Sequence, residues 1–205
     1  GEPEHDRVPH YSTSIEGATG VCFSPDDKKV LLVWERGAWS SPGGAVNAGE
    51  CKTEALAREL NEELGVTLDT KRPIYYLGGW SQGRARDNLM NDNFSAYACT
   101  LVSEDFAPDR KEIFEARWFN WRELLDKWKE SGHVWEKKVK SIDLGMKPER
   151  NIVQGNILAW LTAYKEGGPN GTYVKALVKE TKEEKPNCGG LWVTKASWGM
   201  GMTKK

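Results

Sequence analysis

The sequence predicts an α/β fold, because segments with strand character alternate along the chain with segments that carry a helical apolar stripe. The strand-like segments are apolar or rich in branched and aromatic side chains, and they lie at residues 17–23, 29–34, 74–80, 94–101 and 114–121. The helix-like segments repeat apolar residues every three or four positions, and they lie at residues 51–64, 122–130 and 148–165. A chain of 205 residues suits one such domain, with or without an appendage.

Turn signals set the order of the first elements. Residues 24–27, Ser-Pro-Asp-Asp, separate the first two strand-like segments and predict a hairpin. Residues 41–44, Ser-Pro-Gly-Gly, then break the chain before the first helix. Gly65 follows that helix at the position where a left-handed residue commonly ends one. The buried stripe of the helix is predicted to consist of Leu56, Leu60 and Leu64.

Three regions are expected along the chain. Residues 1–15 are polar and predict a flexible N-terminal arm, and residues 16–167 hold the main domain. Residues 168–205 form a C-terminal extension after a glycine-rich stop. In this extension, residues 173–181 and 191–198 have partial strand character and predict a β-hairpin, with a flexible tail as the alternative. An extension of this kind would also suit a protein partner.

Composition and charge limit the class of protein. Hydrophobic residues make up 39% of the chain and charged residues 29%, as in a soluble globular domain. A net charge of −1 gives no general electrostatic attraction for nucleic acid, so a phosphate ligand would need local cations or a metal. The four cysteines form no Cys-x-x-Cys motif and are irregularly spaced, which argues against a disulfide framework or a zinc site.

The sequence also bears on the cellular location of the protein. No apolar run approaches the length of a membrane span, and no signal peptide is visible. We therefore expect a cytoplasmic protein without a membrane span. The chain begins at Gly1 rather than Met, so a removed secretion or targeting segment stays open.

Three glutamates, Glu59, Glu62 and Glu63, stand close together in the first helix pattern. Residues three and four apart are neighbours on a helix surface, so these carboxylates share one face. Like charges at that spacing cost roughly 0.2–0.5 kcal/mol per pair. The repulsion indicates a positive partner, and a hard divalent cation held by oxygen ligands is the natural candidate.

The surrounding segment, residues 44–66, fits the Nudix box at every fixed position. The matching residues are Gly44, Glu50, Arg58, Glu59, Leu60, Glu62, Glu63, Gly65 and Val66. The chain therefore resembles the Nudix hydrolases, and flanking features extend the resemblance to about residues 16–131. The resemblance implies a mixed β-sheet sandwiched between α-helices, with Mg²⁺ or Mn²⁺ as cofactor. It also implies hydrolysis of a diphosphate linkage in a nucleoside diphosphate linked to another moiety, by water attack on phosphorus.

The resemblance assigns metal ligands residue by residue. Glu59, Glu62 and Glu63 match the metal-binding carboxylates. Glu50 matches the first acid of the box, which closes the loop and can contribute to the metal site. Gly43 matches a glycine whose backbone carbonyl often joins the coordination shell.

The remaining catalytic candidates are one arginine and two later acids. Arg58 matches the arginine that orients the carboxylates, and Glu54 and Glu62 lie within its reach at four residues' distance. The general base is expected to be Glu59, with Glu112 and Glu115 as alternatives, because family members use either a box glutamate or an acid from a later loop.

Aromatic side chains near the box are candidates for contact with a nucleobase. Trp34 and Trp39 flank the approach to it, and Phe94 and Tyr97 lie on a later strand. Stacking on a base is worth roughly 1–3 kcal/mol. Packing within the sheet is the alternative interpretation of all four rings.

Several basic side chains are candidates for binding distal phosphates of a substrate or an RNA. Arg84 and Arg86 could grip distal phosphates as charge-assisted donors, or they are ordinary surface arginines. A modest basic stretch, which solvated side chains explain as well, consists of Lys137, Lys138, Lys140, Lys147 and Arg150.

The substrate stays open among a nucleotide sugar, a dinucleoside polyphosphate, an mRNA 5′ cap and a diphosphoinositol phosphate. The predicted partner is thus a small diphosphate or a capped RNA. The alternative hypothesis is a catalytically retired Nudix module that binds a nucleotide, an RNA or a protein. The intact acids argue against it, because a module without catalysis has no reason to keep mutually repelling carboxylates.

Overall fold

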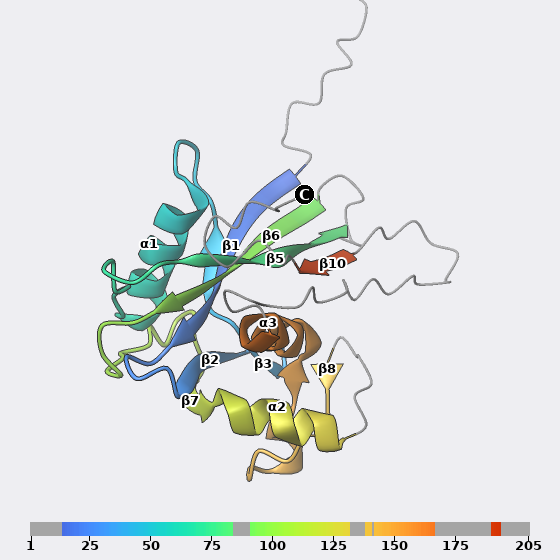
Figure 1. The fold of residues 1–205 in the computed structure, drawn as a ribbon. Coiled ribbons are helices and arrows are strands. Elements are labelled where there is room, and N and C mark those ends of the chain that lie inside the picture. Colours follow the sequence, from blue (N-terminus) through green and yellow to red (C-terminus); the bar gives the residue numbers. More distant parts are fainter. Residues whose placement is uncertain (1–13, 84–90, 132–137, 141, 167–189, 194–205) are drawn as a thin grey trace, which may run out of the picture.

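The computed structural model describes residues 14–83, 91–131, 138–140, 142–166 and 190–193 (Figure 1). Its strands are β1 (Ser14–Phe23), β2 (Lys29–Glu35), β3 (Ala38–Ser40), β4 (Gly43–Ala45), β5 (Tyr75–Gly83), β6 (Asn91–Thr100), β7 (Ala116–Asn120), β8 (Lys138–Val139), β9 (Val153–Gln154) and β10 (Gly190–Val193). The helices are α1 (Lys52–Leu64), α2 (Trp121–Glu130) and α3 (Gly155–Glu166), with one 3₁₀ turn, η1 (Pro148–Arg150).

The described strands form one mixed sheet with the order β10-β5-β6-β1-β2-β3-β9-β8, and β4 and β7 branch from it onto β1 and β2. β1 runs parallel to β6 along its whole length, and β3 runs parallel to β9. β1 and β2 pair antiparallel, with Cys22 opposite Leu31, which confirms the predicted hairpin. The remaining described pairs are antiparallel.

Helices cover both faces of the sheet, with α1 on one side and α2 and α3 on the other (Figure 1). Because both faces are buried, β2 reads as a continuous apolar run rather than an alternating one. Its Leu31 and Val33 pack in the α1 core, whereas Val30 and Leu32 pack in the core beneath α2 and α3. The structure thus confirms an α/β fold with a mixed sheet between helices.

Helix α1 forms as the sequence predicts. Leu56, Leu60 and Leu64 are each fully buried against the sheet. Gly65 ends the helix at φ 65°, a left-handed conformation that favours glycine, and its N–H bonds the carbonyl of Asn61 at 2.9 Å. The packed leucine stripe therefore fixes which face of α1 turns away from the core.

The predicted helix at residues 148–165 is wrong in its first half. Pro148 opens the turn η1 instead, and Val153 lies in β9 opposite Trp39 of β3. The amide of Trp39 also bonds the carbonyl of Ile152 at 2.8 Å. This branched, apolar stretch pairs with the edge of β3 instead of forming a helix, so α3 begins only at Gly155.

Several boundaries differ from the sequence prediction. β1 already begins at Ser14, inside the predicted arm, and β5 and β6 extend further into the connection between them. The short strands β3, β4, β8 and β9 were not predicted. β10 overlaps the start of the predicted strand at residues 191–198 and pairs antiparallel with β5. Its predicted hairpin partner, residues 173–181, lies outside the described residues.

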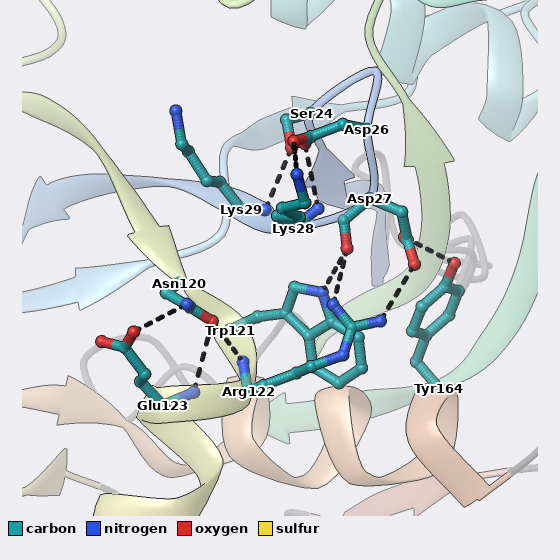
Figure 2. Close-up of polar contacts among 10 residues, drawn as sticks. All are labelled: Ser24, Asp26, Asp27, Lys28, Lys29, Asn120, Trp121, Arg122, Glu123 and Tyr164. Carbon is teal, nitrogen blue, oxygen red and sulfur yellow. Dashed lines mark hydrogen bonds and ion pairs between the residues drawn. The ribbon is translucent and has the colours of Figure 1, made fainter.

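The β1–β2 turn ties the sheet to α2 and α3 (Figure 2). Asp27 accepts a hydrogen bond at its carboxylate from the hydroxyl of Tyr164, at 2.9 Å. The carbonyl of Asp27 accepts from Trp121 Nε1 and from Arg122, each at 2.9 Å. Burial and the nearby Asp27 carboxylate raise the pKa of Tyr164, so its hydroxyl stays a donor. These hydrogen bonds hold α2 and α3 to the turn between β1 and β2.

Candidate active site

Arg58 organises the acidic face of α1, because each of its five N–H donors has a partner. Nε and Nη2 bind the two oxygens of Glu50, at 2.7 and 3.0 Å. Nη1 binds Glu59 and Glu62, both at 2.9 Å. Nη2 also bonds the carbonyl of Ala45 at 3.0 Å. One guanidinium therefore holds three carboxylates and the loop before the helix.

This network differs from the sequence expectation in one partner. Glu54 does not bind Arg58; its carboxylate accepts the N–H of Cys51 at 2.9 Å and caps the start of α1. Glu50 takes its place from the loop, and Arg58 is the leading cause of its lowered pKa. Both oxygens of Glu50 are thus engaged, one of them also by the N–H of Asn47 at 3.0 Å.

Two glycines allow the loop to lie directly against the acids. Gly43 has φ 144°, and a Cβ there would lie 2.2 Å from the carbonyl oxygen of Ala18 on β1. A Cβ on Gly44 would lie 2.4 Å from the carboxyl carbon of Glu59. Contacts this short do not occur between real atoms, so only glycine fits at position 43, whereas a side chain at position 44 would displace the Glu59 carboxylate. The Glu59 carboxylate consequently packs against β4, and only 16% of the Glu59 side chain is exposed.

Glu63 is the most perturbed acid of the site. Burial, and then the charge of Glu59, raise the pKa of Glu63 to about 7, and the charges of Glu35 and Glu112 act in the same direction. The backbone N–H of Gly43 opposes the shift by donating to the carboxylate. The oxygen Oε2 of Glu63 is buried and has no hydrogen-bond partner among the residues that the structure describes.

Glu35 is an acid that the sequence analysis missed. It ends β2, and the structure brings it close enough to Glu63 to raise the pKa of that carboxyl. Its only sequence signal is a charge directly after an apolar strand. Glu112 reaches the same place from the segment between β6 and β7, because Asp109 N–H bonds the carbonyl of Glu63 at 2.8 Å and Glu112 N–H bonds the carbonyl of Asp109 at 3.0 Å.

The chemistry of these donors fits a hard divalent cation. The donors are all oxygens, which Mg²⁺ and Mn²⁺ prefer. A buried carboxylate oxygen without a partner costs free energy unless a cation or proton satisfies it, and Glu63 Oε2 is such an atom. Within the described residues no three His, Cys, Asp or Glu side chains already converge on one point, since Arg58 draws Glu59 and Glu62 to itself. The residues that would hold the ion are Glu59, Glu62, Glu63 and the carbonyl of Gly43.

Glu115, one of the alternative bases, is bound to two arginines. Its carboxylate pairs closely with Arg150, and it also contacts Arg117 at 3.2 Å. Its carbonyl accepts the N–H of Trp34 at 2.7 Å, which joins β2 to the start of β7. Glu112 is exposed, so Glu112 is the more accessible of the two later acids.

The two tryptophans proposed for base stacking have different environments. Trp39 is fully buried, and its Nε1 donates to the carbonyl of Arg150 at 2.9 Å, which agrees with the packing alternative. Trp34 is half-buried, contacts Trp39 edge to face at 5.4 Å, and carries the guanidinium of Arg150 4.1 Å from its ring centre. Trp34 is therefore only partly buried, and it packs against the core beneath α2 and α3.

The other substrate candidates lie elsewhere on the sheet. Phe94 stacks on Trp80 with ring centres 5.2 Å apart, and Tyr97 lies 5.6 Å from Tyr76. Burial raises the pKa of Tyr97. Both candidates thus make the sheet contacts expected from packing. Arg84 and Arg86 lie outside the described residues.

The predicted basic stretch is partly engaged in the fold. Lys138 donates to the carbonyl of Arg36 at 2.5 Å, and Arg150 is paired with Glu115. Lys137 lies outside the described residues. In the part of the chain that the structure describes, no helix is long and apolar enough to cross a membrane.

A mixed sheet between helices, with an acid-rich helix docked on a glycine turn, is the architecture of a Nudix domain. The family model described as NUDIX domain matches residues 15–139, more than half of the chain. The chain belongs to this family.

Individual relatives are more distant. The chain is 27% identical over 140 residues to "Nudix hydrolase 7" of Arabidopsis thaliana, a match that covers 65% of this chain and 46% of that protein. It is 36% identical over 75 residues to "RNA pyrophosphohydrolase" of Stutzerimonas stutzeri, covering 35% of this chain and 46% of that one. The chain thus spans less than half the length of each of these relatives.

Among solved structures, the chain is similar to the MutT NUDIX hydrolase from Burkholderia pseudomallei. The TM-score is 0.45 at 22% sequence identity, and the match covers 54% of this chain and 86% of that one.

Proposed function

We propose that this chain hydrolyses a diphosphate linkage in a nucleoside diphosphate linked to another moiety, with Mg²⁺ or Mn²⁺ as cofactor. The observation that carries the proposal is the Glu63 carboxylate, which has a buried oxygen without a hydrogen-bond partner among the described residues and whose pKa burial and the charges of Glu59, Glu35 and Glu112 raise. A bound divalent cation would supply charge neutralisation on the phosphates and a water of lowered pKa.

The residues of the chain then have separate roles. Glu59, Glu62 and Glu63 hold the ion, and Arg58 orients two of these carboxylates while keeping Glu50 against the loop. The glycine turn lets Glu59 approach the loop backbone. Positioning and electrostatics of this kind provide most of the catalysis in phosphoryl transfer.

The general base is Glu59 or Glu112 in this proposal. Glu115 is less suited, because its carboxylate already binds Arg150 and Arg117. Glu59→Gln and Glu112→Gln separate the two remaining candidates by pH–rate profile. The variant without the base loses the acidic limb of the profile, whereas the other keeps it.

The proposal is tested by a hydrolysis panel with and without Mg²⁺ or Mn²⁺. The panel contains ADP-ribose, a nucleotide sugar, dinucleoside polyphosphates, capped RNA and a diphosphoinositol phosphate. Reaction in ¹⁸O-labelled water shows whether water attacks phosphorus, because the label then appears in a phosphate product. We expect metal-dependent release of a nucleoside monophosphate from at least one substrate.

A matched pair of variants completes the test. Glu63→Gln should lose most turnover while it keeps its fold, and Glu130→Gln, an exposed acid on α2, should behave as the wild type. Inactivity of the wild type on the whole panel with either ion would favour the retired binding module instead.

An RNA substrate is a narrower form of the proposal. The relatives named RNA pyrophosphohydrolase support testing it. Binding of capped RNA that weakens steeply with salt would favour an RNA-tracking surface. A flat salt response would restrict the substrate to small diphosphates.

A further inference from the structure

The peptide group between Pro42 and Gly43 connects β1 to the acids of α1. Its oxygen, the carbonyl of Pro42, accepts two hydrogen bonds from β1, one from the Gly20 N–H at 2.9 Å and one from the Thr19 hydroxyl at 3.0 Å. Its nitrogen, the N–H of Gly43, donates to the Glu63 carboxylate. The peptide group is thus bonded to β1 at one end and to the acidic site at the other.

The register of β4 against β1 explains why Gly43 can reach the acids. Thr19 and Gly43 lie opposite each other in this antiparallel pair of strands. A ladder bond joins the Gly20 N–H to the Pro42 carbonyl, so the neighbouring pair is of the kind that exchanges no hydrogen bonds. In such a pair the N–H and C=O groups of both residues point away from the partner strand. Both backbone groups of Gly43 therefore face away from β1.

Thr19 contributes the side chain that holds this peptide group. It is a polar residue in the interior, with 6% of its surface exposed. A hydroxyl has one proton to donate, and the Pro42 carbonyl at 3.0 Å is its nearer acceptor, with the Ser41 carbonyl at 3.3 Å. Loss of this donor would leave the Pro42 carbonyl with the Gly20 bond and would let the peptide group tilt, together with the Gly43 N–H.

We propose that Thr19 is a positioning residue of the ion site, which acts by fixing the peptide group between Pro42 and Gly43. Held in this orientation, Gly43 presents its N–H to Glu63 and leaves its carbonyl for the divalent cation. Hydrogen bonds in a chain polarise one another, so the Thr19 bond also strengthens the bond that Gly43 donates. This inference rests on the proposed hydrolase function. Thr19 was not among the site residues predicted from the sequence.

The direct test measures Mn²⁺ binding by electron paramagnetic resonance, without substrate. Thr19→Val keeps the shape of the side chain and removes the hydroxyl, whereas Thr19→Ser keeps the hydroxyl. Thr162→Val is the matched control, because the Thr162 hydroxyl also donates to a backbone carbonyl, that of Leu158 on α3, at 2.7 Å. We expect Thr19→Val to weaken Mn²⁺ binding about tenfold, and Thr19→Ser and Thr162→Val to bind as the wild type does.

A purely structural role of Thr19 predicts a different pattern. Thr19→Val would then melt at a lower temperature, but at temperatures far below its melting point it would bind Mn²⁺ with the wild-type affinity. That result would overturn the inference. Equal weakening of Mn²⁺ binding in Thr19→Ser and Thr19→Val would also overturn it, because the hydroxyl would then not be the cause.

Hydrogen exchange of the wild type provides a test that needs no variant to fold. The Gly43 N–H faces away from β1, so its protection from exchange depends on the bond to Glu63. We expect this amide to exchange slowly in the metal-free wild type and faster in Thr19→Val. A Gly43 amide that exchanges in the wild type like an unprotected amide would contradict the inference.

The two proposals fail separately. Metal-dependent hydrolysis together with unchanged Mn²⁺ binding in Thr19→Val would leave the proposed function standing and contradict the role of Thr19. Mn²⁺ binding that needs the Thr19 hydroxyl, in a protein that hydrolyses nothing, would support the role of Thr19 at the ion site and contradict the hydrolase.

Discussion

Arg58 is the residue on which the acidic face depends, since it holds Glu50, Glu59 and Glu62 with one planar group. Lysine offers three donors on a single nitrogen and cannot reproduce the fork. These ion pairs are partly exposed, so they contribute little to stability. Their main effect is to fix the positions of the three carboxylates.

Arg58→Lys should therefore lower kcat/KM by roughly 10- to 100-fold, as loss of residues that orient metal ligands generally does. The melting temperature should change little. Arg72→Lys serves as the control, because the one ion pair of the Arg72 side chain within the described residues is a long contact of 3.9 Å with Asp69. Unchanged kcat/KM in Arg58→Lys would show that the network does not position the acids.

Glu63 makes stability depend on pH when no metal is bound. Its pKa rises from 4.5 to about 7 in the fold, so the folded state holds this proton more strongly than the unfolded state. The resulting stabilisation is complete below about pH 4.5 and is lost as the pH rises through about 7. Above pH 7 the charged carboxylate is buried among like charges.

Glu63→Gln should consequently be more stable than the metal-free wild type at pH 8, by about 1–2 kcal/mol after allowance for partial exposure. The difference should shrink toward pH 4.5. Chemical denaturation at several pH values in the presence of a chelator measures it, and added Mg²⁺ should stabilise only the wild type strongly. Identical pH profiles of the two proteins would contradict the assigned pKa.

At the scale of elements, the acidic site depends on α1 and also on the turn before it, which contains Gly43 and Gly44. A leucine at every fourth residue was enough to predict α1 and its buried face, and the glycine at position 65 predicted its end. The first half of the helix predicted at residues 148–165 failed, because sheet pairing with β3 outweighed the local apolar pattern. Short strands such as β3 and β4 depend on partners distant in sequence, so local patterns do not reveal them.

Gly44→Ala tests the contact between the turn and the helix. The new methyl group would lie 2.4 Å from the Glu59 carboxyl carbon, so the Glu59 side chain must swing away. Because a flexible side chain can yield, we expect a small change in thermal stability but a loss of activity of roughly 10- to 100-fold. Full activity in Gly44→Ala would mean that the position of Glu59 against the turn is dispensable.

At the scale of the whole molecule, the fold brings together acids from three segments. The helical acids were predictable, because residues three and four apart on a helix must share a face. Glu35 was not, since its approach to Glu63 depends on where β2 ends relative to α1. Likewise, the pairing of Glu115 with Arg150 joins residues 35 positions apart, and no local spacing predicts it.

The proposed hydrolysis depends on the binding of a hard divalent cation by these acids. Electron paramagnetic resonance of Mn²⁺ tests this directly and needs no substrate, because bound Mn²⁺ loses the sharp signal of the free ion. We expect the wild type and Glu130→Gln to bind Mn²⁺, Mg²⁺ to compete for the site, and Glu63→Gln to bind at least about tenfold more weakly. A wild type that leaves the free Mn²⁺ signal unchanged, or a Glu63→Gln variant that binds as the wild type does, would contradict the account.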